Sequence, residues 1–266
     1  MSKELYYEVT GSGPLLLLIA GGTDDTRDFA GMTPLLSDGY TVVSYDCRGI
    51  SRSRSDGPPP DVSMETQVED AHWVLKAAGG GPAHVFGNSS GGLIALALAA
   101  RHPDLVRTVV THEPPAISLL SADDPRRKLG HEVDEAYRSG GVDAAMTLFA
   151  AGAGFDKWDP DPPGGIAESP EAMAQMQAKL ARMQTNLEFF FGHAALPYMS
   201  YKPVVDPSIH VVVAVGEQSR GQLPHDTALA LAERLGVKPI MVPGGHSGFV
   251  THPTAFAHKL RQILAY

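Results

Sequence analysis

The sequence predicts an α/β fold: a mostly parallel central sheet with helices on both faces and an inserted helical cap. Two observations support this prediction. Apolar, strand-like runs alternate with helical stretches towards both ends of the chain, which is typical of a parallel sheet covered by helices. From Pro114 to about Pro203 the strand signals stop and only helical stretches occur. A chain of 266 residues, of which 43% are hydrophobic, is long enough for one large core of this kind.

The elements of the first half follow in a regular order. Residues 5–9 alternate in polarity and residues 14–20 are apolar, with "GSG" between them, which indicates a hairpin that leads into a buried strand. The run "YTVVSYD" over 40–46 predicts another strand, followed by the polar loop "RGISRSRSDGPPP". The next expected elements are a helix over 63–78, a strand over 83–88, a helix over 90–101 and a strand over 105–113.

The second half begins with helices and then returns to the alternating pattern. Helical stretches are expected near 126–138, 142–150 and 170–191, with a proline-rich loop, "DKWDPDPPGG", between the last two. The alternation resumes with a strand over 209–216, a helix over 224–235, a strand over 237–243 and a helix over 253–264. We therefore expect a core built from residues 1–113 and 206–266, interrupted by a helical cap over 114–205.

Charge and composition narrow the classes of partner. The net charge of −9 argues against a nucleic-acid partner. The sequence also shows no basic amphipathic helix of the kind that binds membrane surfaces, which argues against a membrane partner. The single cysteine, Cys47, excludes an internal disulfide. The first residues lack the apolar core of a signal peptide, and the apolar run 15–20 is too short to cross a membrane. We expect a cytoplasmic protein with a small-molecule partner, no metal and no cofactor; a homodimer stays open.

The stretch "FGNSSGG" over 86–92 predicts a nucleophile. A strand that turns sharply into a helix with the pattern G-x-S-x-G needs its glycines because side chains there would clash as the chain doubles back. Gly87 and Gly91 flank Ser89, which places Ser89 at the turn with its hydroxyl above the sheet. A serine hydroxyl is a poor nucleophile without a base, so a histidine is required.

The base and the acid are expected from the ends of later strands. His246 follows the last strand in the loop "PGGHSGF", whereas His252 stands directly before Pro253 and suits the start of a helix. In the stretch "GEQSRG", Ser219 occupies the position where many such proteins carry an aspartate. Glu113 ends the strand after the elbow helix, at the edge where ligands bind in open α/β sheets, so we predict it as the acid, with Glu217 as the alternative.

Two backbone N–H groups are expected to stabilise a developing oxyanion. The first belongs to Ser90, which follows the nucleophile at the start of a helix. The second is expected from the loop "AGGTDD" after the first long strand, where the glycine pair permits a close approach of the backbone. We predict Gly22 for this role, with Thr23 as the alternative.

These motifs resemble those of the α/β-hydrolase superfamily and, within it, the zearalenone lactonases. The stretches that carry the resemblance are "RGISRS" at 48–53, "GNSSGG" at 87–92, "HEPPA" at 112–116 and "HSGFVTHPTAFAHKL" at 246–260. The resemblance implies a triad of Ser89, Glu113 and His246, with oxyanion donors at Gly22 and Ser90. Residues 117–205 depart from the lactonase cap, and the cap determines specificity.

The expected activity is hydrolysis of a carboxylic ester or lactone through an acyl-enzyme. The expected cap holds five of the nine methionines and five of the nine phenylalanines, which favours a hydrophobic or aromatic substrate such as a zearalenone-type lactone. Trp158 is predicted as a wall of the substrate site. The alternatives are a general carboxylesterase or a carbon–carbon bond hydrolase on the same triad, and a small-molecule receptor with this fold.

Overall fold

One sheet organises the protein. The computed structural model describes residues 5–54, 57, 62–155 and 170–265. In these residues seven strands form a sheet in the order β1-β3-β2-β4-β5-β6-β7, and every neighbouring pair is parallel except β1 with β3. The strands are β1 (Tyr7–Thr10), β2 (Leu15–Ile19), β3 (Thr41–Tyr45), β4 (Ala83–Asn88), β5 (Val106–His112), β6 (His210–Gly216) and β7 (Ile240–Val242).

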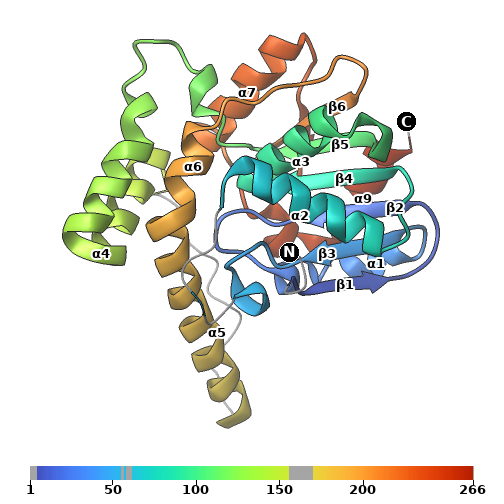
Figure 1. The fold of residues 1–266 in the computed structure, drawn as a ribbon, viewed down its shortest axis with the longest axis horizontal. Helices are drawn as coiled ribbons and strands as arrows, with labels where there is room; N and C mark the ends of the chain where they lie inside the picture. Colours follow the sequence, from blue (N-terminus) through green and yellow to red (C-terminus); the bar gives the residue numbers. More distant parts are fainter. Residues whose placement is uncertain (1–4, 55–56, 58–61, 156–169, 266) are drawn as a thin grey trace.

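Helices cover both faces of this sheet, as predicted (Figure 1). On one face lie α2 (Met64–Ala77), α3 (Ser90–Arg101) and α7 (Leu223–Leu235), and on the other lie α1 (Thr33–Ser37), α8 (Gly248–Thr251) and α9 (Pro253–Leu264). Because helices cover both faces, both sides of strand β2 are buried, which explains why its sequence is apolar throughout. Leu17 and Ile19 are buried in the core on the first face, and Leu16 and Leu18 are buried in the core on the second.

The sequence analysis predicted a hairpin between the first two strands, and this prediction is wrong. β1 pairs antiparallel with β3, with Tyr7 opposite Tyr45, and makes no ladder with β2. Both edges of β2 are already occupied by parallel partners, β3 and β4. β1 therefore adds to the free edge of β3, where it ends the sheet.

The described residues between β5 and β6 form helices and turns without a strand. They include α4 (Leu129–Ala153), α5 (Pro170–Phe189), a π-helical turn over Phe190–Ala194 and α6 (Ala195–Ser200). The two helices expected near 126–138 and 142–150 are confirmed: they are the two parts of α4, separated at Gly141, whose φ of 70° and ψ of −160° are not helical. We call residues 114–205 the cap segment; that they form a domain of their own stays a prediction.

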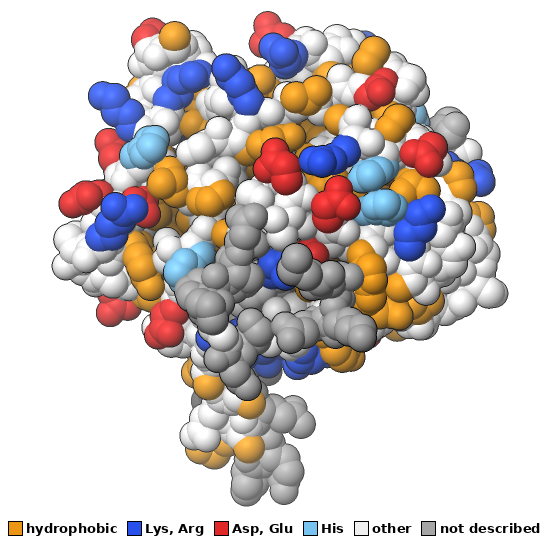
Figure 2. Space-filling view, in the orientation of Figure 1, with side chains coloured by type: hydrophobic (Ala, Val, Ile, Leu, Met, Phe, Trp, Pro, Cys, Tyr) orange, Lys and Arg blue, Asp and Glu red, His pale blue; other side chains and the backbone are white. Residues whose placement is uncertain are grey.

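The cap segment lies at one end of the strands, and α5 projects beyond the rest of the ribbon (Figure 1). On the face shown in Figure 2, acidic and basic side chains are interspersed rather than gathered into areas of one sign. Among the described residues, no helix combines the length and apolar character that crossing a bilayer requires.

Candidate active site

Ser89 stands at a strained turn between β4 and α3. Its φ of 53° and ψ of −126° lie outside the regions that non-glycine residues ordinarily adopt. The flanking glycines are required by space. A Cβ atom on Gly87 would lie 2.2 Å from the carbonyl oxygen of Gly91, and one on Gly91 would lie 2.3 Å from that of Ile19. The G-x-S-x-G pattern therefore has the structural context of a nucleophile elbow.

His246 and Glu113 form a buried pair at the carboxyl ends of the strands. His246 Nδ1 lies 2.8 Å from Glu113 Oε2, and Glu113 is fully buried. The other carboxylate oxygen, Oε1, accepts a hydrogen bond of 2.8 Å from the N–H of Gly216. The backbone of Glu113 also adopts a left-handed conformation, with a φ of 48°. Both oxygens of the acid are thus held, one by the sheet and one by the histidine.

The environment keeps Glu113 ionised. Burial raises its pKa, but the hydrogen bond and charge of His246 outweigh burial and bring the pKa down to about 2. Because an ionised carboxylate only accepts hydrogen bonds, Nδ1 of His246 carries the proton of this bond. Nε2 of neutral His246 then has a free lone pair, as a general base requires.

The alternative acid does not reach this histidine. Glu217 is exposed, and no hydrogen bond joins its carboxylate to His246 in the described part of the chain. Ser219, at the position where many such proteins carry an aspartate, is fully buried, and its hydroxyl has no hydrogen-bond partner among the described residues. The structure therefore brings Glu113, and not Glu217, together with His246.

Ser89 and His246 face one cavity but are not hydrogen-bonded to each other in the described structure. In enzymes without a bound substrate, catalytic hydrogen bonds are often long and tighten only when substrate binds. The phenyl ring of Phe155 packs against the imidazole of His246, with ring centroids 5.5 Å apart. Ser89, His246 and Phe155 therefore line the same cavity.

The expected oxyanion donors also lie beside Ser89. Ser90 begins α3, where the first N–H groups of a helix have no partner within the helix. The N–H of Gly22 donates a hydrogen bond of 2.8 Å to the hydroxyl of Ser90, which is buried. A Cβ atom on Gly21 would lie 2.4 Å from the carbonyl oxygen of Asn88, so this glycine allows the loop to approach the elbow. The sequence analysis missed that the Ser90 side chain binds Gly22.

His112 is a further residue near the site, and the sequence analysis did not single it out. It is fully buried, its ring stacks on that of His246 with centroids 6.2 Å apart, and its Nδ1 lies 2.8 Å from Asn88 Oδ1. Burial lowers the pKa of His112 to about 4, with a smaller contribution from His246. His112 is thus neutral near pH 7. In the sequence, its position directly before Glu113 was the signal that could have indicated a place near the site.

The cavity above Ser89 is lined mostly by apolar side chains. The space between its lining residues is about 410 Å³ including open solvent, and the centre of a water molecule can reach about 30 Å³ of it. The cap segment contributes Pro115, Phe149, Ala153, Phe155, Phe190, Tyr198 and Met199, and α7 contributes Leu223 and Pro224. Trp158, predicted as a substrate wall, lies outside the described residues. The aromatic residue observed beside His246 is Phe155, three positions earlier in the chain.

Comparison with known proteins places these features in context. Residues 14–149 match the family model described as alpha/beta hydrolase fold. The chain is 31% identical to the uncharacterized hydrolase YraK of Bacillus subtilis, over 98% of this chain and 92% of that protein. It is 29% identical to a zearalenone hydrolase of Cladophialophora bantiana, over 95% of this chain and 89% of that protein.

A solved structure shares the overall fold. A thermophilic esterase from Thermogutta terrifontis superposes with a TM-score of 0.68 at 21% identity, and the match covers 98% of this chain and 93% of that one.

Proposed function

This chain belongs to the α/β-hydrolase family, and from that premise we propose that it is a serine hydrolase that cleaves a carboxylic ester or lactone. The superfamily predicted from the sequence motifs is thereby confirmed, and hydrolase activity follows from the family. The bond type rests mainly on one observation. Ser89, at a strained elbow, faces the same cavity as His246, whose Nδ1 is held 2.8 Å from the buried carboxylate of Glu113.

The reaction that fits this geometry is acyl transfer to water. Nε2 of His246 takes the proton of the Ser89 hydroxyl as its oxygen attacks the carbonyl carbon. The tetrahedral intermediate collapses when His246 returns that proton to the leaving alkoxide, which leaves an acyl ester on Ser89. Water, deprotonated by His246, then attacks the ester and releases the acid. In a lactone the leaving alcohol stays attached to the acyl group.

The oxyanion is stabilised at the start of α3. The backbone N–H of Ser90 is one donor, because it lies next to the nucleophile and has no partner within the helix. The N–H of Gly22 contributes through the Ser90 hydroxyl, which accepts its hydrogen bond and keeps its own proton for the oxyanion. This arrangement uses both residues predicted for the oxyanion hole.

The substrate class follows from the cavity wall. Its lining is dominated by aromatic and aliphatic side chains, among them Phe149, Phe190 and Met199, which suit a hydrophobic or aromatic ester rather than a sugar or a charged metabolite. One relative is named a zearalenone hydrolase. We therefore propose zearalenone, a macrocyclic aromatic lactone, as the first substrate to test.

The test is hydrolysis by the purified protein, followed by chromatography. Zearalenone and p-nitrophenyl butyrate are incubated in parallel, and a Ser89→Ala variant serves as the blank. Ring opening with kcat/KM above about 10⁴ M⁻¹s⁻¹, the low end of the usual enzyme range, supports a lactonase. Turnover of the p-nitrophenyl ester alone supports a carboxylesterase for another substrate. Equal rates for the protein and Ser89→Ala on both substrates would overturn the proposal and favour a carbon–carbon bond hydrolase or a receptor.

A further inference from the structure

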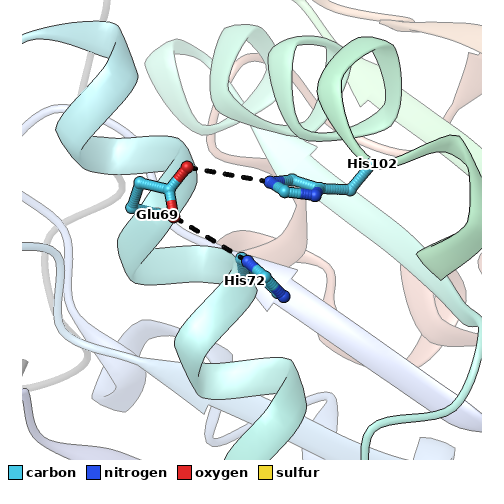
Figure 3. A group of neighbouring side chains, drawn as sticks. All are labelled: Glu69, His72 and His102. Carbon is cyan, nitrogen blue, oxygen red and sulfur yellow. Dashed lines mark ion pairs between the residues drawn. The ribbon is translucent and has the colours of Figure 1, made fainter.

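A cluster of side chains with ligand chemistry lies away from the proposed active site. Glu69 and His72 stand one turn apart on α2, and His102 directly follows α3, which packs against α2. Figure 3 shows the Glu69 carboxylate beside the two imidazole rings, with one oxygen towards each. The rings themselves lie against each other, with centroids 4.2 Å apart. One ligand atom from each residue can be chosen so that all three lie within 4.8 Å of one another.

The distances in this cluster fit a shared ion better than hydrogen bonds. Glu69 Oε2 lies 3.8 Å from His72 Nδ1, and Glu69 Oε1 lies 3.8 Å from His102 Nε2. Both separations exceed hydrogen-bond length, and His102 Nε2 is buried without a hydrogen-bond partner in the described structure. Two ligands about 2.1 Å from one tetrahedral ion lie about 3.4 Å apart, so small side-chain rotations would complete the site.

We propose that Glu69, His72 and His102 bind a divalent transition-metal ion of the Zn²⁺ type, which joins α2 to the end of α3. Imidazole nitrogen and carboxylate oxygen are ligands that zinc prefers, and three protein ligands leave a fourth position for water.

Arg101 is the group that competes with the ion. Its Nε lies 3.5 Å from Glu69 Oε1, so the guanidinium neutralises part of the negative charge that would attract a cation. About half of the Arg101 side chain is exposed, which leaves it free to turn into solvent when an ion binds. The guanidinium therefore tunes affinity without closing the site.

The ion would stabilise the fold rather than take part in hydrolysis. Ser89 precedes α3 and His102 follows it, so the length of the twelve-residue helix separates them, about 18 Å at 1.5 Å per residue. A metal between α2 and α3 therefore fixes the helix whose first turn carries Ser90. Metal removal should lower the melting temperature and leave the hydrolysis rate at 25 °C unchanged.

Calorimetric titration with ZnCl₂ tests the site. The protein carries no polyhistidine tag and is first treated with EDTA and dialysed. We expect one ion per chain with Kd below about 10 µM; at a free Zn²⁺ concentration of 100 Kd the folded state is favoured about 100-fold more. Loss of a neighbour that orients a metal ligand weakens binding about 10- to 100-fold, so His72→Ala and His102→Ala should each weaken it at least tenfold. His258→Ala, at an exposed histidine on α9, is the matched control.

Arg101→Ala gives a test with the opposite sign. If the cluster binds an ion, removing the competing guanidinium should tighten Zn²⁺ binding and increase the rise in melting temperature that Zn²⁺ causes. If the cluster is only an ion-pair network, Arg101→Ala should leave the response to Zn²⁺ unchanged. Kd weaker than about 100 µM, which at 100 µM ion shifts the folding equilibrium only about twofold, would overturn the proposal. Equal affinity of the wild type, His72→Ala and His102→Ala would do the same.

Discussion

The hydroxyl of Ser90 decides how the oxyanion site works. It accepts the Gly22 N–H at 2.8 Å, so that N–H does not point directly into the cavity in this state. If the hydroxyl, polarised by this bond, donates a hydrogen bond to the oxyanion, Ser90→Ala should lower kcat about 10²- to 10³-fold with little change in KM, since one donor of such a site is worth about that much. Ser90→Thr keeps the hydroxyl and should retain most of the rate.

An unchanged or higher rate in Ser90→Ala would be equally informative. If Gly22 donates directly to the oxyanion, the hydroxyl competes with it and Ser90→Ala should be at least as active as the wild type. Steady-state kinetics on p-nitrophenyl butyrate, with circular dichroism to check folding, separates the two outcomes. A rate for Ser90→Ala at or above that of the wild type contradicts the relay through the hydroxyl.

The two glutamates near the last strands offer a paired test of the acid. Glu113→Gln keeps the shape of the side chain but removes the charge that fixes the His246 tautomer and stabilises its protonated form, so kcat should fall by about 10³-fold or more. Glu217→Gln, at an exposed position without a bond to His246 in the described structure, should change kcat less than about threefold. The reverse order of these two effects would falsify the assignment of Glu113.

His112 links pH to stability. Its pKa falls from an ordinary value near 6.5 to about 4 in the folded protein, so the unfolded chain binds its proton first as pH decreases. The stability that neutral His112 contributes is therefore complete above pH 6.5 and is lost as pH falls from 6.5 to 4. For a fully buried group this amounts to about 3 kcal/mol.

Urea unfolding between pH 4 and pH 7 measures this contribution. The free energy of unfolding of the wild type should rise with pH across this interval, and the rise should be smaller in His112→Gln. The variant is also expected to be less stable at pH 7, because the bond between His112 Nδ1 and Asn88 changes. Parallel pH profiles for the two proteins would contradict the role given to His112.

At the scale of the elements, Asn186 near the end of α5 binds two loops, one that contains Thr23 and one that contains Ser51. The Asn186 amide donates to the Thr23 carbonyl and to the Ser51 hydroxyl, both at 2.9 Å, and its oxygen accepts from the Ser51 N–H at 3.0 Å. Asn186 is buried, so its loss leaves partners unsatisfied. Because Thr23 adjoins Gly22, the same contact positions the loop of the oxyanion site.

Asn186→Ala should therefore affect stability and activity together. We expect a loss of about 1–3 kcal/mol in the free energy of unfolding, as for other buried groups left unpaired, and a lower kcat/KM. Gln184→Ala, at an exposed position two residues earlier in α5, is the control and should change neither. An Asn186→Ala variant with lower stability but unchanged kcat/KM would show that the contact does not reach the oxyanion loop.

Local patterns predicted the elements that local sequence determines. The elbow could be predicted because a Cβ atom on Gly87 or Gly91 would clash with the backbone, so the five-residue pattern around Ser89 requires these glycines. The pairing of β1 with β3 could not, because it depends on which edge of the sheet is still free after β2 has bound its two parallel partners. The break in α4 could also be found, because the helical pattern ends at 138 and resumes at 142, on either side of Gly141.

For the molecule as a whole, proximity between distant segments was the hardest feature to predict. Glu113 and His246 could be paired because both follow strands of one parallel sheet, whose carboxyl ends meet at one edge. His72 on α2 and His102 directly after α3 are thirty residues apart, and no regular spacing in the sequence joins them. Phe155 reaches His246 only because the cap segment folds over this edge.

The apolar cavity predicts a preference of the whole molecule for hydrophobic acyl groups. Ser89 from the first third of the chain, Phe155 from the cap segment and His246 from the last loop line one cavity, so a longer acyl chain would contact all three parts. kcat/KM should be higher for p-nitrophenyl hexanoate than for the acetate, by about tenfold, if two of the four added methylenes are buried at about 0.8 kcal/mol each.

Phe155→Ala tests whether the cap segment supplies this preference. The variant removes the ring beside His246, so the ratio of kcat/KM for hexanoate to that for acetate should fall severalfold, while the rate with acetate changes less. Met173→Ala, at an exposed methionine of α5, removes an apolar side chain that does not line the cavity and should leave the ratio unchanged. An unchanged ratio in Phe155→Ala would mean that the preference arises from the sheet and α7 rather than from the cap segment. The search for a natural substrate would then start from Leu223 and Pro224, the α7 residues on the same wall.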